Sequence, residues 1–280
     1  MRLPQHLSRL TIVLTLSVGL LTPMAANMVG AQAGASDGSA RETALVTVLS
    51  PRPHGFAPPA SGLRPDPERI ARAAERVARW TNVLVHVSRT LPAFARPRAD
   101  AAQVGVVPAG SKYYGIPIVA WVETVSADGR WGLVELPYTW PRREGWIRLG
   151  GLSRDRTRVR VEVDLSQHMV IVRKFGNVLF RAPGATGASY SPTPVGEYFV
   201  TDRVPFGAGG ALGSFAFGIS GIQPRLPAGW SGGNQLAIHG TNNPSSIGRS
   251  VSAGCVRVSE STLDRLMPLL AYGTPVIVHA

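Results

Sequence analysis

The stretch "AIHGTNNPSSIGRSVSAGCVRVS", residues 237–259, contains the only cysteine of the 280-residue chain, Cys255, and a histidine upstream of it, His239. His239 follows a short apolar run, "LAI" at 236–238, which is typical of a buried strand. A polar loop rich in Gly, Asn, Pro and Ser comes next and lets the chain double back. The pattern predicts a strand that ends at the histidine, with the thiol returning nearby.

A thiol in this position needs a partner to react. With a pKa near its ordinary value of about 8.5, a thiol is ionised to only a few per cent at neutral pH, so a cysteine nucleophile requires a base or a positive neighbour. The imidazole of His239 is the candidate base. The alternative is that Cys255 is a small buried apolar residue. Spacing alone leaves both interpretations open.

Two neighbours of the thiol favour chemistry. Gly254 permits a backbone angle closed to other residues, and the N–H groups of Gly254 and Cys255 could converge on an oxyanion. Arg257 stands two residues after Cys255, so in an extended segment it shares a face with the thiol and could hold a substrate carboxylate. The alternative for Arg257 is an ordinary surface cation.

The segments "IHGTNNPSSIG" and "SAGCVRV" closely resemble the catalytic signature of the L,D-transpeptidases, the YkuD-fold enzymes of bacterial wall synthesis. Upstream, "VEVDLSQHMVIV" resembles the family's opening strands, and "TPVG" at 193–196 resembles its threonine-proline-any-glycine segment. The resemblance runs from residue 158 to the C-terminus. It implies a mostly β protein whose catalytic domain, residues 157–280, is a YkuD-type β-sandwich.

The resemblance also assigns roles. It makes Cys255 the nucleophile and His239 the general base and acid, and it makes the backbone carbonyl of Gly240 the group that orients the imidazole. The oxyanion role of the Gly254 N–H stays as inferred above. Many members have a second histidine just before the Gly-Cys pair, where this chain has Ala253. We expect that difference to affect rate rather than reaction type.

Substrate binding is expected from Arg257, Asn242 and Ser252. The implied reaction is an acyl transfer through a thioester, in which the D-Ala after the third stem-peptide residue leaves and an amine of a second stem forms a 3→3 cross-link. The expected partners are peptidoglycan stem peptides, and no metal or organic cofactor is needed. The resemblance further implies acylation by carbapenem-type β-lactams.

Three other functions stay open. With water as the acceptor the protein would be an L,D-carboxypeptidase, and with a protein amine it would be an anchoring enzyme. It could also be an inactive wall-binding protein. The presence of His239, Gly254, Cys255 and Arg257 together argues against the inactive form.

The N-terminal residues have the composition of an export signal. Arg2 and Arg9 precede an apolar run at 11–21, and "AQA" at 31–33 offers a small-residue cleavage site. The run is short for a membrane span. We therefore expect an exported protein, periplasmic or in the cell wall, with a signal peptide at 1–33; an uncleaved anchor is the alternative.

Between the signal and the catalytic domain the pattern changes three times. Residues 34–65 are rich in Pro, Ala and Gly and read as a linker. The pattern of residues 66–80 predicts a short helix, and we expect its weak apolar stripe to pack on the next domain; contact of its basic face with a membrane is the alternative. Residues 81–150 contain short β-branched and aromatic runs and resemble a small bacterial SH3-like barrel, with Trp121, Trp131 and Trp146 in its core or rim. In the catalytic domain, "SESTLDRLMPLL" predicts one helix after the cysteine, capped by Ser259.

Charge bears on the partners. The formal net charge is +12 at pH 7, which suggests an anionic partner such as a wall polymer. The alternative is an ordinary solvated surface. No phosphate loop, zinc-type cluster or RNA-binding signature is present in the sequence, so nucleic acid is not expected. We expect a monomer.

Overall fold

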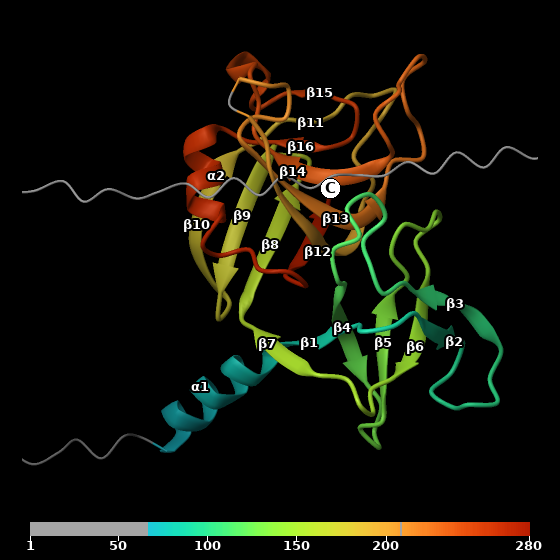
Figure 1. Ribbon diagram of the computed structural model, residues 1–280. Coiled ribbons are helices and arrows are strands. Elements are labelled where there is room, and N and C mark those ends of the chain that lie inside the picture. The colour runs from blue at the N-terminus through green and yellow to red at the C-terminus, as the bar shows by residue number, and fades with distance from the viewer. Residues whose placement is uncertain (1–66, 208) are drawn as a thin grey trace, which may run out of the picture. The chain divides into compact units, whose positions relative to one another are not determined.

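The computed structural model describes residues 67–207 and 209–280 (Figure 1). The predicted signal peptide and linker, residues 1–33 and 34–65, lie outside the described residues. The described residues belong to one compact unit and are mostly β, with two α-helices among them. The predicted mostly β class is therefore confirmed.

Helix α1 spans Pro67–Arg79, close to the predicted range. Glu68 lies in its first turn, and Arg76 and Arg79 lie in its last, an order that suits the helix dipole. None of its residues is buried, and Ile70 is largely exposed. The prediction that its apolar stripe packs on the next domain is wrong, because two of the four residues in that stripe, Ala73 and Ala74, offer little apolar area to bury.

A seven-stranded antiparallel sheet follows the helix. Its order is β3-β2-β6-β5-β4-β1-β7. The strands are β1 (Asn82–His86), β2 (Leu91–Phe94), β3 (Gln103–Val107), β4 (Val119–Val125), β5 (Trp131–Glu135), β6 (Glu144–Arg148) and β7 (Arg154–Thr157). The sheet therefore extends past residue 150, where we predicted the SH3-like domain to end. The SH3-like assignment itself stays a prediction.

The seven-stranded sheet has its own core. Val85, Ala93 and Ile147 are fully buried there, and Trp121 and Trp131 are nearly so. Phe199, which comes from the catalytic region of the chain, is also fully buried in this core. The two sheets are therefore joined by apolar packing.

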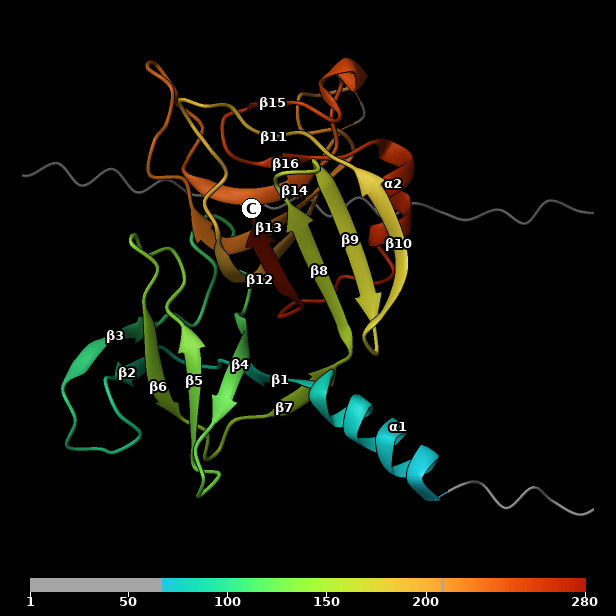
Figure 2. The same ribbon diagram turned by 180° about the vertical axis from the view of Figure 1, so that it is seen from behind.

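The predicted catalytic domain forms an eight-stranded sheet, named the catalytic sheet, of order β10-β9-β8-β17-β12-β13-β14-β16 (Figure 2). These strands are β8 (Val159–Asp164), β9 (Met169–Lys174), β10 (Asn177–Pro183), β12 (Gly196–Pro205), β13 (Phe215–Ile222), β14 (Gln235–His239), β16 (Val256–Arg257) and β17 (Pro275–His279). A small parallel pair joins β11 (Thr186–Gly187) to β15 (Ser250–Ser252), and a 3₁₀ turn, η1, spans Pro244–Ser246.

Strand β12 joins two parts of this sheet. Its first half, Gly196 to Phe199, pairs with β17, and its second half, Val200 to Pro205, pairs with β13. A register shift between Val200 and Asp202 lies near this change of partner. We predicted a sandwich of two layers. The strands instead form one continuous hydrogen-bonded order, because the long strand β12 pairs with β17 on one side and β13 on the other.

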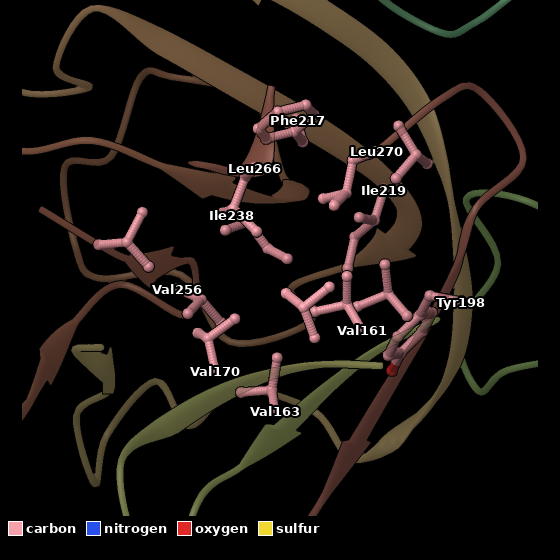
Figure 3. Close-up of a cluster of buried hydrophobic side chains, with 14 of the residues drawn as sticks. Val161, Val163, Val170, Tyr198, Phe217, Ile219, Ile238, Val256, Leu266 and Leu270 are labelled. Carbon is pink, nitrogen blue, oxygen red and sulfur yellow. The ribbon is translucent and has the colours of Figure 1, made fainter. Parts of the chain in front are cut away.

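The core of the catalytic sheet is drawn in Figure 3. Val159, Val161 and Val163 alternate along β8 and are all buried. Phe217 from β13 and Ile238 from β14 are fully buried in the same cluster. This packing fixes β14, the strand that ends at the histidine.

Helix α2 spans Glu260–Leu266. Its predicted N-cap is confirmed, because the Ser259 hydroxyl accepts a hydrogen bond from the N–H of Thr262 at 3.2 Å. The helix is shorter than predicted. Pro268 accounts for this, since it has no N–H to donate to the carbonyl of Asp264, although Met267 before it is still helical. Among the described residues, no helix is long and apolar enough to cross a bilayer.

Candidate active site

His239 is the last residue of β14 and its side chain is buried. Leu236 and Ile238 point into the core, so Ala237 and His239 lie on the other face of the strand. The Nδ1 atom of His239 lies 2.6 Å from the carbonyl oxygen of Gly240. A carbonyl only accepts, so Nδ1 carries the proton and Nε2 keeps its lone pair. The contact expected between His239 and Gly240 is present.

The protonation state of His239 follows from its burial. Burial lowers the pKa of the imidazole to about 4. The Arg257 cation lowers this pKa further, whereas the carbonyls of Gly240 and Leu212 oppose the shift. The imidazole is therefore neutral at physiological pH, which is the form that accepts a proton.

Cys255 is half-buried beside the edge of β14. Its Sγ lies 3.9 Å from the carbonyl oxygen of Gln235, which accepts the thiol proton. Burial raises the pKa of the thiol, and the N–H of Ala237 and the charge of Arg257 lower it in opposition. Because the rise prevails, the resting group is a neutral thiol that needs a base.

Strand pairing brings the three side chains of the predicted site to one face. Strands β14 and β16 run parallel, with Ile238 opposite Val256 and His239 opposite Arg257. Extending this register by one residue sets Cys255 beside Ala237. Alternation then puts the side chains of His239, Cys255 and Arg257 on the same side of the ladder. Within the described residues no hydrogen bond joins Cys255 to His239, so the thiol rests against Gln235 instead.

The oxyanion role predicted for Gly254 meets an obstacle. Gly254 has a φ of 115°, a conformation that glycine tolerates and other residues rarely adopt. Its N–H donates to the Ser252 hydroxyl at 3.1 Å, so that donor is already engaged. The N–H of Cys255 has no hydrogen-bond partner in the described part of the chain. It is the donor of the two that remains for an oxyanion.

Ser252 and Asn242, both predicted to bind substrate, make hydrogen bonds within the protein. Ser252 is 1% exposed, and its hydroxyl donates to the carbonyl of Cys255 at 2.6 Å. It therefore braces the turn that carries the thiol, and a buried hydroxyl with both roles filled has nothing left for a substrate. Asn242 is exposed and donates to the carbonyl of Gly209 at 3.3 Å, on the loop between β12 and β13.

Two residues that sequence reasoning gave no role hold Gly254. The Thr193 hydroxyl donates to the Gly254 carbonyl at 2.8 Å and accepts from the N–H of Gly187 at 2.8 Å. Gln223 is buried, and a Cβ added to residue 254 would lie only 2.1 Å from its Nε2, so only glycine fits there. Thr193 had a signal in the "TPVG" segment, whereas Gln223 had none in the sequence.

Arg257 is held by its backbone and leaves its guanidinium available. Its N–H and carbonyl both pair with Ala185, at 2.9 and 2.8 Å. Its buried Nε has no hydrogen-bond partner among the described residues. A buried cationic donor without a partner suits a carboxylate ligand. The structure thus fits the predicted substrate role of Arg257 better than those of Asn242 and Ser252.

Gly240 is also required by its surroundings. A Cβ on it would lie 2.2 Å from Oε1 of Glu260. That carboxylate accepts hydrogen bonds from the backbone N–H and the hydroxyl of Ser214. The close approach keeps the loop before β13 against the residue whose carbonyl orients His239. Within residues 67–207 and 209–280, no group of His, Cys, Asp and Glu side chains is arranged to hold a metal ion.

The sequence has relatives in this region. Residues 158–278 match the family model YkuD, the L,D-transpeptidase catalytic domain. YkuD of Bacillus licheniformis is 30% identical over 119 residues, which are 42% of this chain and 64% of that protein. YkuD of Bacillus subtilis is 32% identical over 97 residues, 35% of this chain and 51% of that protein. The chain thus spans about half to two thirds of the length of these curated relatives.

Two solved structures match this chain at low identity and low TM-score. L,D-transpeptidase 3 from Mycobacterium tuberculosis, in complex with a faropenem-derived adduct, is 19% identical with a TM-score of 0.39, over 70% of this chain and 93% of that chain. An L,D-transpeptidase from Mycobacterium smegmatis is 19% identical with a TM-score of 0.37, over 58% and 89% of the two chains. Residues 158–278 of this chain are thus similar in sequence to the L,D-transpeptidase catalytic domain.

Proposed function

We propose that the protein is a peptidoglycan L,D-transpeptidase that works through a thioester on Cys255. One observation carries the proposal. A neutral imidazole, with Nδ1 bonded to the Gly240 carbonyl, shares a face of the β14–β16 ladder with the only thiol of the chain. A base with a free Nε2 beside a protonated thiol is the arrangement that nucleophilic cysteine chemistry requires.

In the first step the sulfur attacks the carbonyl carbon of the third stem-peptide residue. The thiol proton passes to Nε2 of His239, and the developing oxyanion is stabilised by the N–H of Cys255. The intermediate then collapses, and the bond to the terminal D-Ala breaks. The departing amine takes the proton from the imidazole, and the acyl group stays on sulfur as a thioester.

In the second step the side-chain amine of another stem attacks the thioester. It loses a proton to Nε2 of His239, the carbon–sulfur bond breaks, and the thiolate recovers the proton. The product is a 3→3 cross-link. Arg257 supplies a positive donor for a carboxylate of the stem peptide.

The test uses a disaccharide-tetrapeptide donor and mass analysis of the products, with Cys255→Ala beside the unmodified protein. A dimer heavier by two donors minus one D-Ala, absent with Cys255→Ala, supports the transpeptidase. Tripeptide without dimer points to the L,D-carboxypeptidase. Equal cross-linking by both proteins would contradict the proposal, and no turnover by either would favour a wall-binding protein.

Two further parts of the proposal have their own tests. A carbapenem should add its mass to the unmodified protein and not to Cys255→Ala, because the β-lactam carbonyl mimics the donor carbonyl. Export, inferred from residues 1–33, predicts that the protein is found outside the cytoplasm on cell fractionation. Recovery of the full chain in the cytoplasmic fraction would contradict export.

A further inference from the structure

The sulfur of Cys255 lies against the backbone edge of β14. The Gln235 carbonyl accepts from the thiol at 3.9 Å, and the Ala237 N–H donates to the sulfur. Both groups belong to the backbone, so no side-chain substitution removes them directly. Whatever holds the start of β14 in place therefore also fixes the environment of the thiol.

The Gln235 side chain anchors this edge in the catalytic sheet. Its Nε2 donates to Oδ2 of Asp202 at 2.6 Å and to the hydroxyl of Thr201 at 2.9 Å. Asp202 and Thr201 are both completely buried. Gly218 leaves room for the contact, since a Cβ there would lie 2.6 Å from Gln235 Nε2. The amide is therefore held in a buried polar site.

The preceding residue is anchored by the other sheet. Tyr113, on the connection between β3 and β4, donates its hydroxyl proton to Oδ1 of Asn234 at 3.1 Å, and the N–H of Asn234 donates to the same hydroxyl at 3.1 Å. Lys112 adds a third bond, from Nζ to Oδ1 at 3.0 Å. The Tyr113 ring also lies against Gly233, where a Cβ would approach it to 2.9 Å.

We infer that Tyr113 and Gln235 are positioning residues for Cys255. Tyr113, beside the seven-stranded sheet, and Gln235, in the catalytic sheet, together hold the start of β14 against the sulfur of Cys255. The inference rests on the proposed role of Cys255 as nucleophile. It makes the seven-stranded sheet a working part of the active site, because a tyrosine 121 residues away in sequence from Asn234 restrains the segment that contacts the thiol.

The effect of losing Tyr113 has a definite direction. A looser Asn234–Gln235 segment weakens the N–H donation from Ala237 to the sulfur. A hydrogen bond to a charged acceptor contributes more than one to a neutral thiol, so the thiolate loses more stabilisation than the thiol does. His239 and Arg257 face the same sulfur and stay in place. The pKa of Cys255 should therefore rise when Tyr113 loses its hydroxyl.

The experiment measures alkylation of Cys255 by iodoacetamide in the full chain, without substrate. Cys255 is the only cysteine, so the label reports on this thiol alone. Tyr113→Phe should react about 3-fold to 10-fold more slowly at pH 7.5, with the midpoint of its pH–rate profile about half to one unit higher, since one unit is a tenfold change in thiolate below the pKa. Gln235→Leu should shift the profile in the same direction.

Tyr114→Phe is the matched control. Tyr114 is the next residue, is 51% exposed and makes none of the contacts to Asn234. Equal alkylation rates and midpoints for Tyr113→Phe and Tyr114→Phe would overturn the inference, even if Tyr113→Phe melts at a lower temperature. With the stem-peptide donor, Tyr113→Phe should lower kcat with little change in KM.

The two proposals fail separately. If the unmodified protein makes no cross-linked product but Tyr113→Phe still slows alkylation, the positioning role stands and the proposed reaction falls. If the protein makes the product and Tyr113→Phe alkylates at the normal rate, the reaction stands and the positioning role falls.

Discussion

Each sheet contains a titratable side chain that burial keeps neutral at pH 7, and the consequences differ between the two. Glu135, at the end of β5 in the seven-stranded sheet, is 2% exposed, and burial raises its pKa to about 8. His239, at the end of β14 in the catalytic sheet, is 4% exposed, and burial lowers its pKa to about 4. Desolvation disfavours the charged form of both.

The difference lies in what each group faces. Glu135 accepts a hydrogen bond from the Ser220 hydroxyl of β13, so it lies where the two sheets meet, and the hydroxyl beside it is completely buried. His239 lies on the same face as the thiol and keeps Nε2 free. A strongly shifted pKa therefore marks a candidate base only when the local geometry also supplies a reacting partner.

The largest expected effect comes from a substitution that disturbs the catalytic sheet and leaves the seven-stranded sheet unchanged. In Gly254→Ala the new Cβ would lie 2.1 Å from Nε2 of Gln223, at a φ of 115°. Gln223 cannot easily move, because its Nε2 also donates to the carbonyl of Pro192 at 2.9 Å. Displacing the turn before Cys255 should cost at least about 100-fold in kcat, as misplacement of about 1 Å can.

The control for Gly254→Ala is Gly150→Ala, next to the seven-stranded sheet, where a Cβ meets nothing within 4 Å. Its turnover and melting temperature should match those of the unmodified protein. The test is to measure turnover of the stem-peptide donor by both variants. Comparable activity for the two would mean that the conformation of residue 254 does not control the thiol.

The second effect concerns stability and Glu135. Its pKa is about 8 in the folded chain against an ordinary 4.5, so the folded state holds a proton that the unfolded state has lost between these values. Stability from this group is full below pH 4.5 and is lost as pH rises through 8. Glu135→Gln should remove this loss, which is on the order of 5 kcal/mol.

The measurement is urea unfolding at pH 5 and pH 8.5. Glu135→Gln should gain stability relative to the unmodified protein on going to pH 8.5. Glu75→Gln, on the exposed surface of α1, serves as the control and should follow the unmodified protein at both pH values. Parallel curves for all three proteins would show that Glu135 does not titrate as described.

The third effect has the opposite sign and belongs to the catalytic sheet. The pKa of His239 is about 4 in the folded chain against an ordinary 6.5, so the unfolded state takes up the proton first as pH falls. Stability from this group is full above pH 6.5 and is lost as pH falls toward 4, by about 2 to 3 kcal/mol. His239→Gln should flatten this acid slope in urea unfolding, whereas His279→Gln should leave it. An unchanged slope in His239→Gln would contradict the burial argument.

Much of the site could be read from the sequence because its signals are local. The strand before His239, the turn before Cys255 and the cap at Ser259 each depend on a few neighbouring residues. The contact between Tyr113 and Asn234 depends on tertiary packing over 121 residues and has no local signature. The burial of Ser252 has no local signature either, and burial is what favours a structural hydrogen bond over a substrate contact.

Glu135 shows the same limit in the seven-stranded sheet. In "WGLVELP" alternation puts Trp131, Leu133 and Glu135 on one face, yet Leu133 is only half-buried and Glu135 is almost completely buried. The carboxyl is covered by β13, through Ser220, and that layer cannot be inferred from the strand's own residues. The local sequence pattern predicts strand β5, whereas the burial of Glu135 depends on the packing of the second sheet against it.

The smallest expected effect tests whether the dependence of stability on pH comes from burial rather than from the mere presence of a titratable group. His86 on β1 and Asp155 on β7 form an ion pair, with Nε2 and Oδ2 2.7 Å apart and side chains 45% and 66% exposed. Water screens such a pair, so Asp155→Asn should change the free energy of unfolding by no more than about 0.5 kcal/mol at pH 5 or at pH 8.5. Urea unfolding at both values measures this. A loss comparable to that predicted for Glu135 or His239 would mean that short ion pairs on the seven-stranded sheet stabilise the fold strongly despite their exposure, and the contrast drawn between buried and exposed groups would fail.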